Sequence, residues 1–550
     1  MTNIEIAKLL RKVAAAYTVL NENRFKIIAY ENAATAVEHS TSEIKDLWDD
    51  GKLATIPGLG QSITQHIDEL FKRGKVAHWE NVFNKVPKAM FPLLDIPGVG
   101  PKTAYKLVTQ LKLKNEQNAI EKLKRFAIEQ KKTSLVKSVE LYEKGAIKDN
   151  RININLADRI AGEMIAYLGD GVVLGSLRRR VATIGDIDIA AKTNIIDKFV
   201  NYPHKTEIIE QGPTGASIRL SNGRQVDLRI IKPAQWGSMM QYFTGSKYHN
   251  IKLRELAIKK GLKVNEYGIS GKEFSNEKDF YNYLGLEYIP PELREDQGEF
   301  EMTLPKLIEL KNVKGDLHMH SSYNDEPSHD LGDNSMEEML AKAKELKYEY
   351  IAFTEHNPKH GVDILAILKR RFNYIEQLKK SNKYIRIINL LEVDIPPSGE
   401  LNLPEGSEKY LDGILVSVHS EFRLDKDEMT ARVLKALSYP LARIFAHPTS
   451  RLLGKREGIE LDWEQIFDFC KKNNRAIEIN AAPQRLDLPD VLVREAVKKK
   501  VLLSLGTDAH STDSLEMMPY GIDVARRGWA EKSDIINCWN YDKLMKWIRG

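Results

Sequence analysis

The acidic residues whose spacing is most suited to chemistry lie in the stretch "GSLRRRVATIGDIDIA". Asp186 and Asp188 interrupt an apolar run, and the alternation of a strand places both side chains on one face, opposite the isoleucines. Asp227 in "RQVDLRI" repeats this pattern. Carboxylates held so close repel one another, and a divalent cation removes the repulsion by binding their oxygens. The pattern therefore predicts a cation site.

Three such carboxylates on neighbouring strands would hold two magnesium ions for phosphoryl transfer. Upstream, Gly175 and Ser176 predict a tight turn with N–H and hydroxyl donors for phosphate oxygens. The arginines 178–180 would neutralise a triphosphate. An isolated D-x-D is more often a surface feature than a site, but G-S-x-R-R followed by G-D-x-D is much more specific.

Histidines gather in the second half, where eight of the 13 lie beyond residue 315. In "GDLHMHSSYND" a strand places Asp316, His318 and His320 on one face, and "GTDAH" repeats this with Asp508 and His510. A lone histidine at a strand end is more often structural than a ligand. Several in that position, together with carboxylates, favour a zinc or manganese cluster, because the ends of barrel strands converge. The others that end apolar runs are His356, Glu392, His419 and His447.

Composition limits the class of protein. The 550 residues exceed one hydrophobic core and predict several domains. An apolar share of 42% and a charged share of 29% indicate a globular protein. The net charge of +5 is small for this length, so contacts with nucleic acid would depend on positive charge concentrated in particular regions. Cys470 and Cys538 alone provide no disulfide framework and no cysteine-type zinc site. Without a signal segment or bilayer-spanning run, we expect a cytoplasmic protein with no membrane partner.

The elements that must position these residues change in character along the chain. Residues 1–145 show helical spacing, and from about 150 short β-branched runs alternate with helices. A segment rich in proline and charge, 287–316, predicts a linker. Beyond it, repeated short strands and helices predict an α/β barrel or layered domain.

Two glycine hairpins divide the helical region, "IPGLG" with Gly58 and Gly60 and "IPGVG" with Gly98 and Gly100. A single P-G-x-G is usually a helix stop. Two copies, each followed by a lysine-bearing helix, predict backbone N–H groups that hold DNA phosphates without reading sequence. Lys102 begins the second of these helices.

The first acidic pattern resembles the nucleotidyltransferase palm of family X DNA polymerases, the group that includes DNA polymerase beta. The resemblance extends to "YFTGSKYHNIKLRELAIKKGLKVNEYGI" and implies that Asp186, Asp188 and Asp227 bind catalytic Mg²⁺ or Mn²⁺. The family usually has glycine where this chain has Arg180. The implied nucleotide-binding residues are Gly175, Ser176, Arg179, Gly185, Tyr242, Phe243, Gly245, Asn250 and Arg254.

The hairpins resemble helix-hairpin-helix modules, which implies that they bind Na⁺ or K⁺ through backbone carbonyls as well as DNA. In the polymerase beta group the first module also carries a Schiff-base lysine, and His66 stands at that position. A histidine cannot form that intermediate, so we expect no lysine-dependent lyase unless Lys72 or Lys75 substitutes. The implied carbonyl donors are Ala54, Ile56 and Leu59, and Leu94, Ile96 and Val99.

The second half resembles a PHP (polymerase and histidinol phosphatase) domain, a distorted seven-stranded barrel with a trinuclear centre. The resemblance implies three divalent ions, Mn²⁺ or Zn²⁺, that act on phosphodiesters. Glu355 would orient a ligand, and Arg451 would either contact a substrate phosphate or lie on the surface. The nine implied ligands are His318, His320, Asp325, His356, Glu392, His419, His447, Asp508 and His510.

The order of the two halves resembles bacterial-type PolX. We expect a multidomain chain with an all-α helix-hairpin-helix region, an α+β nucleotidyltransferase palm and thumb, and a C-terminal distorted (β/α)7 PHP barrel. It would be a monomeric DNA repair polymerase that fills short gaps in primed DNA with deoxynucleoside triphosphates, and whose PHP domain is a 3′-5′ exonuclease and abasic-site endonuclease. The expected domains are 1–80, the first hairpin domain; 81–148, fingers-like helices; 149–240, palm; 241–290, thumb; 291–312, linker; and 313–550, PHP.

Two other classes stay open at this point. Arg180 favours a DNA-binding PHP nuclease whose polymerase palm is impaired. The PHP half would also suit a phosphatase for small molecules, although the tandem hairpins argue against it.

Overall fold

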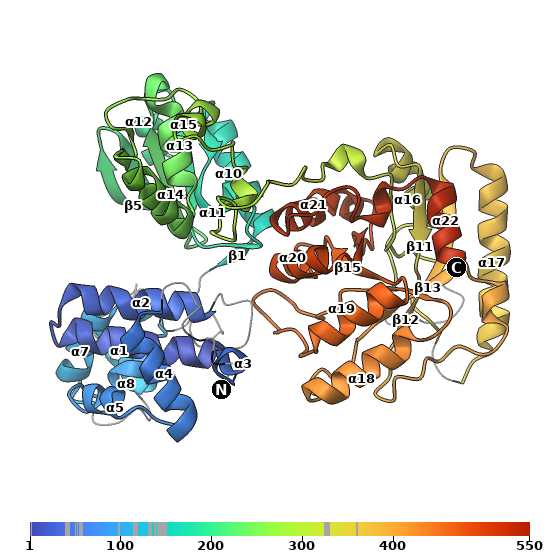
Figure 1. The fold of residues 1–550 in the computed structure, drawn as a ribbon, viewed down its shortest axis with the longest axis horizontal. Coiled ribbons are helices and arrows are strands. Elements are labelled where there is room, and N and C mark those ends of the chain that lie inside the picture. Colours follow the sequence, from blue (N-terminus) through green and yellow to red (C-terminus); the bar gives the residue numbers. More distant parts are fainter. Residues whose placement is uncertain are drawn as a thin grey trace. The chain divides into compact units, whose positions relative to one another are not determined.

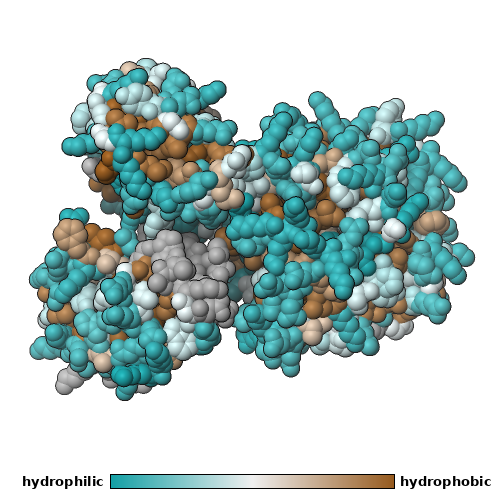
Figure 2. Space-filling model, viewed as in Figure 1, coloured by the Kyte–Doolittle hydropathy of each residue, from teal (hydrophilic) through white to brown (hydrophobic). Residues whose placement is uncertain are grey.

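The chain folds into two compact units, Met1–Asn150 and Arg151–Gly550 (Figure 1). The computed structural model describes residues 1, 3–38, 44–49, 51, 53, 59–96, 99–113, 119–129, 135–136, 139, 151–323, 330–358 and 361–550. Within these ranges no helix is both long and apolar enough to cross a bilayer. Figure 2 shows a mostly hydrophilic surface on the visible face.

The first unit is helical in its described part, as the apolar spacing predicts. Helix α4 (Gln61–Arg73) illustrates the reason, because Ile63, Ile67 and Leu70 recur on its buried face. Gly60 and Gly100 are the N-caps of α4 and α7. The remaining helices are α1 (Asn3–Val19), α2 (Arg24–Glu38), α3 (Ile44–Asp49), α5 (Ala77–Phe83), α6 (Met90–Leu93), α7 (Pro101–Gln110) and α8 (Ala119–Glu129).

A sheet of strand order β2-β4-β7-β6-β5 forms the middle of the chain. Its central strands β4 and β7 run parallel, and the buried side chains of Ile187, Ile189, Val226 and Leu228 face the core. The predicted alternation is therefore confirmed. Bounds are β1 (Ile152–Asn153), α10 (Ile154–Leu168), β2 (Val172–Val173), α11 (Gly175–Arg178), β3 (Thr183–Ile184), β4 (Ile187–Ala191), α12 (Ile196–Val200), β5 (Lys205–Gly212), β6 (Gly215–Leu220) and β7 (Gln225–Ile230).

Helices α13 (Trp236–Thr244), α14 (Lys247–Lys259) and α15 (Glu277–Tyr283), with the hairpin of β8 (Val264–Asn265) and β9 (Gly268–Ile269), follow the sheet. The segment predicted to be a linker packs closely against them. Arg294 is 0% and Glu299 3% exposed. The reason is ion pairing, since Arg294 binds Glu277 of α15 and Glu299 lies 2.8 Å from the buried ring of His249.

The C-terminal part is a parallel sheet in which seven strands of the described residues, β10 to β16, pair in chain order. Helices lie around these strands (Figure 1). Bounds are β10 (Gly315–Asp316), α16 (Met336–Glu345), β11 (Tyr350–Phe353), α17 (Ile364–Ser381), β12 (Arg386–Asp394), β13 (Gly413–Ser417), α18 (Lys426–Leu437), β14 (Ala442–Phe445), α19 (Trp463–Lys472), β15 (Ala476–Asn480), α20 (Asp490–Lys499), β16 (Leu502–Gly506), α21 (Met518–Arg527) and α22 (Tyr541–Arg549).

The sheet is nearly closed into a barrel, which confirms the predicted architecture. A parallel bridge joins Met319, after β10, to Ala509, after β16. The buried amide of Asn537 joins the same two strands, because its Nδ2 donates to the carbonyls of Gly315 and Leu505, both at 2.8 Å. Its Oδ1 accepts from the N–H of Leu505 at 2.7 Å.

We expect Asn537→Ala to lower the free energy of unfolding of the barrel by about 3 kcal/mol, because three buried hydrogen bonds to the backbone of Gly315 and Leu505 are lost. Differential scanning calorimetry should show a melting temperature lower by roughly 6–12 °C. The matched control is Asn473→Ala, whose exposed amide bonds only within its own helix end. Equal melting temperatures for the two variants would contradict the role of Asn537.

Candidate functional site

The three predicted palm carboxylates meet at the paired strands β4 and β7. Asp188 lies directly opposite Asp227 in the register, and Asp186 immediately precedes β4. Burial, followed by the negative charges of Asp186 and Asp227, raises the pKa of Asp188 to about 7. A divalent cation would replace this repulsion with attraction. The donor set therefore fits a divalent metal ion.

The turn of Gly175 lies against this acidic cluster. Its φ is +58°, and a Cβ at this position would collide with the carboxylate of Asp188, so only glycine permits the approach. On the other side, Gln225 Nε2 donates to both carboxylate oxygens of Asp227, at 3.1 and 3.2 Å. The backbone of the phosphate-binding turn predicted from the sequence is thus held beside the acids.

Two of the three consecutive arginines bind the end of helix α13. Arg178 pairs with Glu277, its NH2 lying 2.5 Å from Oε2, and its NH1 donates to Thr244 Oγ1 at 2.6 Å. Arg179 Nε donates to Glu295 at 3.0 Å and its NH1 to the carbonyl of Thr244 at 2.5 Å. Both the side chain and the carbonyl of Thr244 are therefore held by arginine.

Arg180 points toward the barrel. Its guanidinium pairs with both oxygens of Asp158 at 2.8 Å and with Asp523 of α21 at 2.7 Å, and it lies over the ring of Tyr520. Its φ is +59°, a conformation in which glycine has no steric cost. The side chain that favoured an impaired palm in the sequence is thus engaged by carboxylates of α10 and α21.

The remaining predicted nucleotide-binding residues lie on α11, on the turn before β4 and on α13–α14. Asn250 Nδ2 donates to the carbonyl of Tyr242 at 2.7 Å, and its Oδ1 accepts from Gln241 at 2.8 Å. The ring of Phe243 lies beside Tyr242 and under the guanidinium of Arg229. Positions are Ser176 on α11, Gly185 between β3 and β4, Gly245 at the end of α13, and Arg254 exposed on α14.

A second cluster forms where barrel strands end. Glu392 of β12 lies at its centre, with Oε1 2.8 Å from His447 Nε2 and Oε2 3.1 Å from His356 Nδ1. His318 and His320 each place Nε2 3.5 Å from Glu392 Oε2. Among the described residues, several groups could each hold a metal ion, because their possible ligand atoms all lie within 4.8 Å of one another. These groups are His320–His356–His510, His318–Glu392–His447, His318–His320–Asp508 and His356–Asp394–His419.

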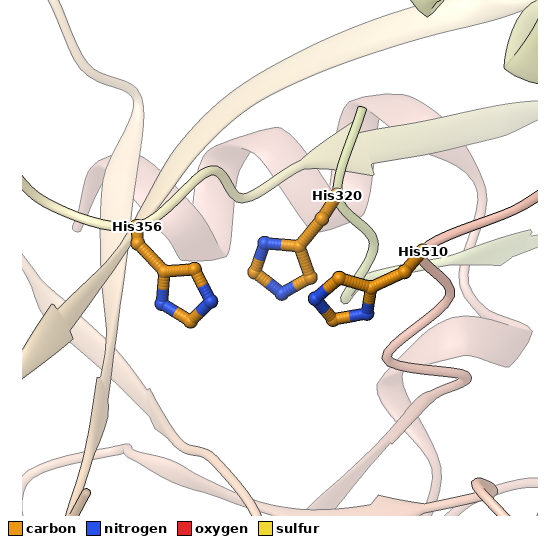
Figure 3. A group of neighbouring side chains, drawn as sticks. All are labelled: His320, His356 and His510. Carbon is orange, nitrogen blue, oxygen red and sulfur yellow. The ribbon is translucent and has the colours of Figure 1, made fainter. Parts of the chain in front are cut away.

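The chemistry of this cluster fits metal ions. The rings of His320, His356 and His510 point toward one shared space (Figure 3). Burial lowers the pKa of His320 to about 4, so its ring is neutral, the form that binds metals. The Nε2 atoms of His318 and His320 are only 3.2 Å apart. Among the described residues, the buried Nδ1 atoms of His320 and His447 have no hydrogen-bond partner.

Carboxylates behind these histidines hold their rings in place. Glu478 lies 2.6 Å from His318 Nδ1 and also accepts from the backbone N–H of His447. Asp394, two residues after Glu392 on the same strand, is bound to His419 Nδ1. Such partners fix the orientation of an imidazole and raise its affinity for metal.

Two further sequence expectations concern residues beside this cluster. Glu355 accepts from the N–H and hydroxyl of Ser321 and pairs with Arg371, so it supports the loop after His320. Arg451 donates to the backbone carbonyls of residues 485 and 486. Its guanidinium therefore has a structural role, while Arg485 Nε lies 3.4 Å from Asp508 Oδ2 at the cluster itself.

Comparison with known proteins covers nearly the whole chain. The family described as "Helix-hairpin-helix domain" matches residues 1–76, "DNA polymerase beta thumb" residues 239–295, and "PHP domain" residues 316–482. The "DNA polymerase/3'-5' exonuclease PolX" of Bacillus subtilis (strain 168) is 32% identical over 564 residues, which covers 97% of each chain.

The chain belongs to the PolX family. This confirms the family expected from the sequence and the expected class of enzyme, a DNA polymerase with a 3′-5′ exonuclease. The chain is also similar to "DNA polymerase lambda" of Rattus norvegicus, 21% identical over 53% of this chain and 56% of that one. A "Probable phosphatase" of Caldicellulosiruptor saccharolyticus is 26% identical over 32% of this chain and 74% of its own.

Several predicted residues of this PolX chain lie outside the described part: Ala54, Ile56, Gly58, Gly98 and Asp325. The other hairpin positions are described. Leu59, Ile96 and Val99 have buried side chains, Leu94 is half-buried, and Lys102 is exposed on α7. The carbonyl of Ile96 accepts from the N–H of Val99 at 3.0 Å. Cation binding at the hairpins stays a prediction.

His66 stands where the polymerase beta group has its Schiff-base lysine. In this PolX chain it is part of an aromatic cluster. His66 Nδ1 lies 2.9 Å from the hydroxyl of Tyr30, and its ring stacks on His78 at 4.9 Å. Trp79 also donates to Tyr30.

Sequence reasoning missed Asp394 and Glu478. The sequence holds a signal for Asp394, because residues i and i+2 of a strand share a face and Glu392 is a predicted ligand. Glu478 lies on β15, inside an apolar run without a histidine, and only the packing of β15 beside β14 and β16 brings it to the ligands.

We expect Glu478→Gln to weaken binding of Mn²⁺ to the barrel by about 10- to 100-fold, because the charge that orients the ring of His318 is lost. Calorimetric titration of the metal-free protein with Mn²⁺ measures this. The control is Glu464→Gln, which changes an exposed carboxylate on α19. Unchanged affinity in Glu478→Gln would show that Glu478 has no part in metal binding.

Proposed function

We propose that this PolX chain fills short gaps in DNA with its palm and trims 3′ ends with its barrel. The observation that carries the proposal is the pair of separate ligand clusters, one of carboxylates on paired strands and one of imidazoles and carboxylates at barrel strand ends. Both donor sets suit ions that act on phosphate esters.

In the palm, Asp186, Asp188 and Asp227 would hold Mg²⁺ or Mn²⁺, which would help to orient the attacking 3′ oxygen and stabilise the leaving pyrophosphate. Ser176 and the turn at Gly175 donate to the triphosphate. The segment at Tyr242–Gly245 contacts the sugar. The other proposed nucleotide contacts are Arg179 and Gly185 to phosphate, Asn250 to the incoming base and Arg254 on the template side.

In the barrel, the proposed ligands would hold three divalent ions, Mn²⁺ or Zn²⁺, which would supply an activated water and neutralise the phosphate. Glu392 is central among the ligands, while Glu478 and Asp394 fix the rings of His318 and His419. The same centre would act on abasic sites. The proposed ligands are His318, His320, Asp325, His356, Glu392, His419, His447, Asp508 and His510.

The hairpins would bind gapped or primed DNA through Gly58, Gly60, Gly98, Gly100 and Lys102. Their carbonyls would hold Na⁺ or K⁺, from Ala54, Ile56, Leu59, Leu94, Ile96 and Val99. Support comes from the helix N-termini that follow Gly60 and Gly100 and from the exposed Lys102. The chain would act as a monomer in the cytoplasm, with the domain boundaries expected from its sequence.

Separate Asp188→Ala and His320→Ala proteins test this proposal on a gapped duplex with a labelled primer. Each variant should lose one activity by more than about a hundredfold, because a ligand matters more than its outer partner. Asp188→Ala should stop primer extension and keep 3′ trimming, and His320→Ala should do the reverse. Each variant is thus the control for the other. Extension by Asp188→Ala, or trimming by His320→Ala, would refute the assignment of that half.

A further inference from the structure

A chain of alternating charges leads from the barrel to the palm. Asp490, at the start of α20, accepts from Arg527 Nε at 2.7 Å. Arg527 NH1 donates to Glu295 at 2.9 Å, and the same carboxylate oxygen accepts from Arg179 Nε at 3.0 Å. Arg527 NH1 also donates to the backbone carbonyl of Arg179 at 2.8 Å. Arg527 thus holds the palm arginine directly at its main chain and, through Glu295, at its side chain.

This chain of alternating charges is shielded from solvent. The side chain of Arg527 is 8% exposed, that of Arg179 14% and that of Glu295 21%. Burial opposes the charge of Glu295, but Arg527 and Arg179 keep the pKa of this carboxyl below its ordinary value. Glu295 is therefore an ionised group between two cations. Loss of either neighbour would leave a poorly solvated, incompletely paired charge.

At the palm, this chain of alternating charges reaches the turn that we assign to the sugar of the nucleotide. Arg179 NH1 donates to the carbonyl of Thr244, and a Cβ on Gly245 would lie 3.1 Å from that nitrogen. Gly245 has a φ of +70°, so the turn combines a glycine conformation with an arginine against it. Arg179 is therefore one of the groups that hold this turn, together with Arg178 at the hydroxyl of Thr244.

We propose that Glu295 and Arg527 are positioning residues for the polymerase nucleotide site, through which helix α21 of the barrel sets Arg179 and the Thr244–Gly245 turn. The inference rests on the proposed function, because it takes that turn as part of the nucleotide pocket. The barrel then has two tasks, its own hydrolytic chemistry and the shaping of a second active site.

The neighbouring arginine provides a matched control. Arg526 lies on the same helix and also joins the barrel to the segment before it, with Nε 2.8 Å from Glu292 and NH1 2.9 Å from the carbonyl of Ile308. None of its hydrogen bonds within the described residues reaches Arg179 or Thr244. Arg526→Ala therefore removes a comparable ion pair without touching the charge chain.

The test uses full-length Arg527→Ala, Glu295→Gln and Arg526→Ala in single-nucleotide gap filling, with kcat and KM determined for a deoxynucleotide and the matching ribonucleotide. We expect Arg527→Ala and Glu295→Gln to raise the KM for the deoxynucleotide about tenfold or more, since a small displacement of the groups that position a substrate is enough to cause such a loss. Their preference for deoxynucleotides should fall, and 3′ trimming should stay within about twofold of the parent. Arg526→Ala should match the parent in every value.

Two further measurements separate positioning from general damage. Arg527→Lys keeps one cation on Glu295 and should recover part of the lost affinity, whether or not Arg527→Ala folds well. The double variant Glu295→Gln/Arg527→Ala should be no worse than the poorer single variant, because both act through one contact.

Equal KM values for Arg527→Ala and Arg526→Ala, or fully additive effects in the double variant, would overturn the inference. A parent protein that fills no gap would refute the proposed polymerase function instead. The two results therefore distinguish failure of the positioning inference from failure of the proposed polymerase function.

Discussion

The crowding of titratable groups into two small spaces is the constraint on which this structure depends. At the palm, Asp188 and Asp227 face each other across paired strands, and their charges repel. At the barrel, the Nε2 atoms of His318 and His320 lie 3.2 Å apart beside the carboxylate of Glu392. Only a rigid scaffold keeps such groups together. The strands supply that rigidity, because β4 and β7 are each paired on both sides and a bridge joins the segments that follow β10 and β16.

The two clusters lie on different scaffolds for the same physical reason. Strand ends place side chains from distant parts of the sequence in one small space, whether the sheet is open, as in the palm, or nearly closed, as in the barrel. In both, a second set of residues holds the first. Gln225 bonds to Asp227, and Glu478 holds the ring of His318. The chemistry is thus prepared before substrate arrives.

The arginines next to the palm acids show where sequence reasoning was incomplete. Their charge suggested a purely phosphate-binding role, whereas Arg178, Arg179 and Arg180 each have carboxylate partners in the thumb, the predicted linker or the barrel. Those partners lie roughly a hundred residues or more along the chain. No local pattern connects them, because ion pairs of this kind depend on which faces pack together.

The amino-acid sequence is enough to predict which residues form the two clusters and on which elements they lie. Strand alternation predicts that Asp186 and Asp188 share a face, and the recurrence of histidine after apolar runs predicts the barrel cluster, since both signals are local. What holds these residues depends on the tertiary structure. Glu478 reaches His318 through the order of the barrel strands, and Glu295 joins Arg179 to Arg527 because the charge-rich segment that contains it packs against both arginines. Periodicity in the sequence indicates which face of a helix or strand is buried, but not which other element packs against that face.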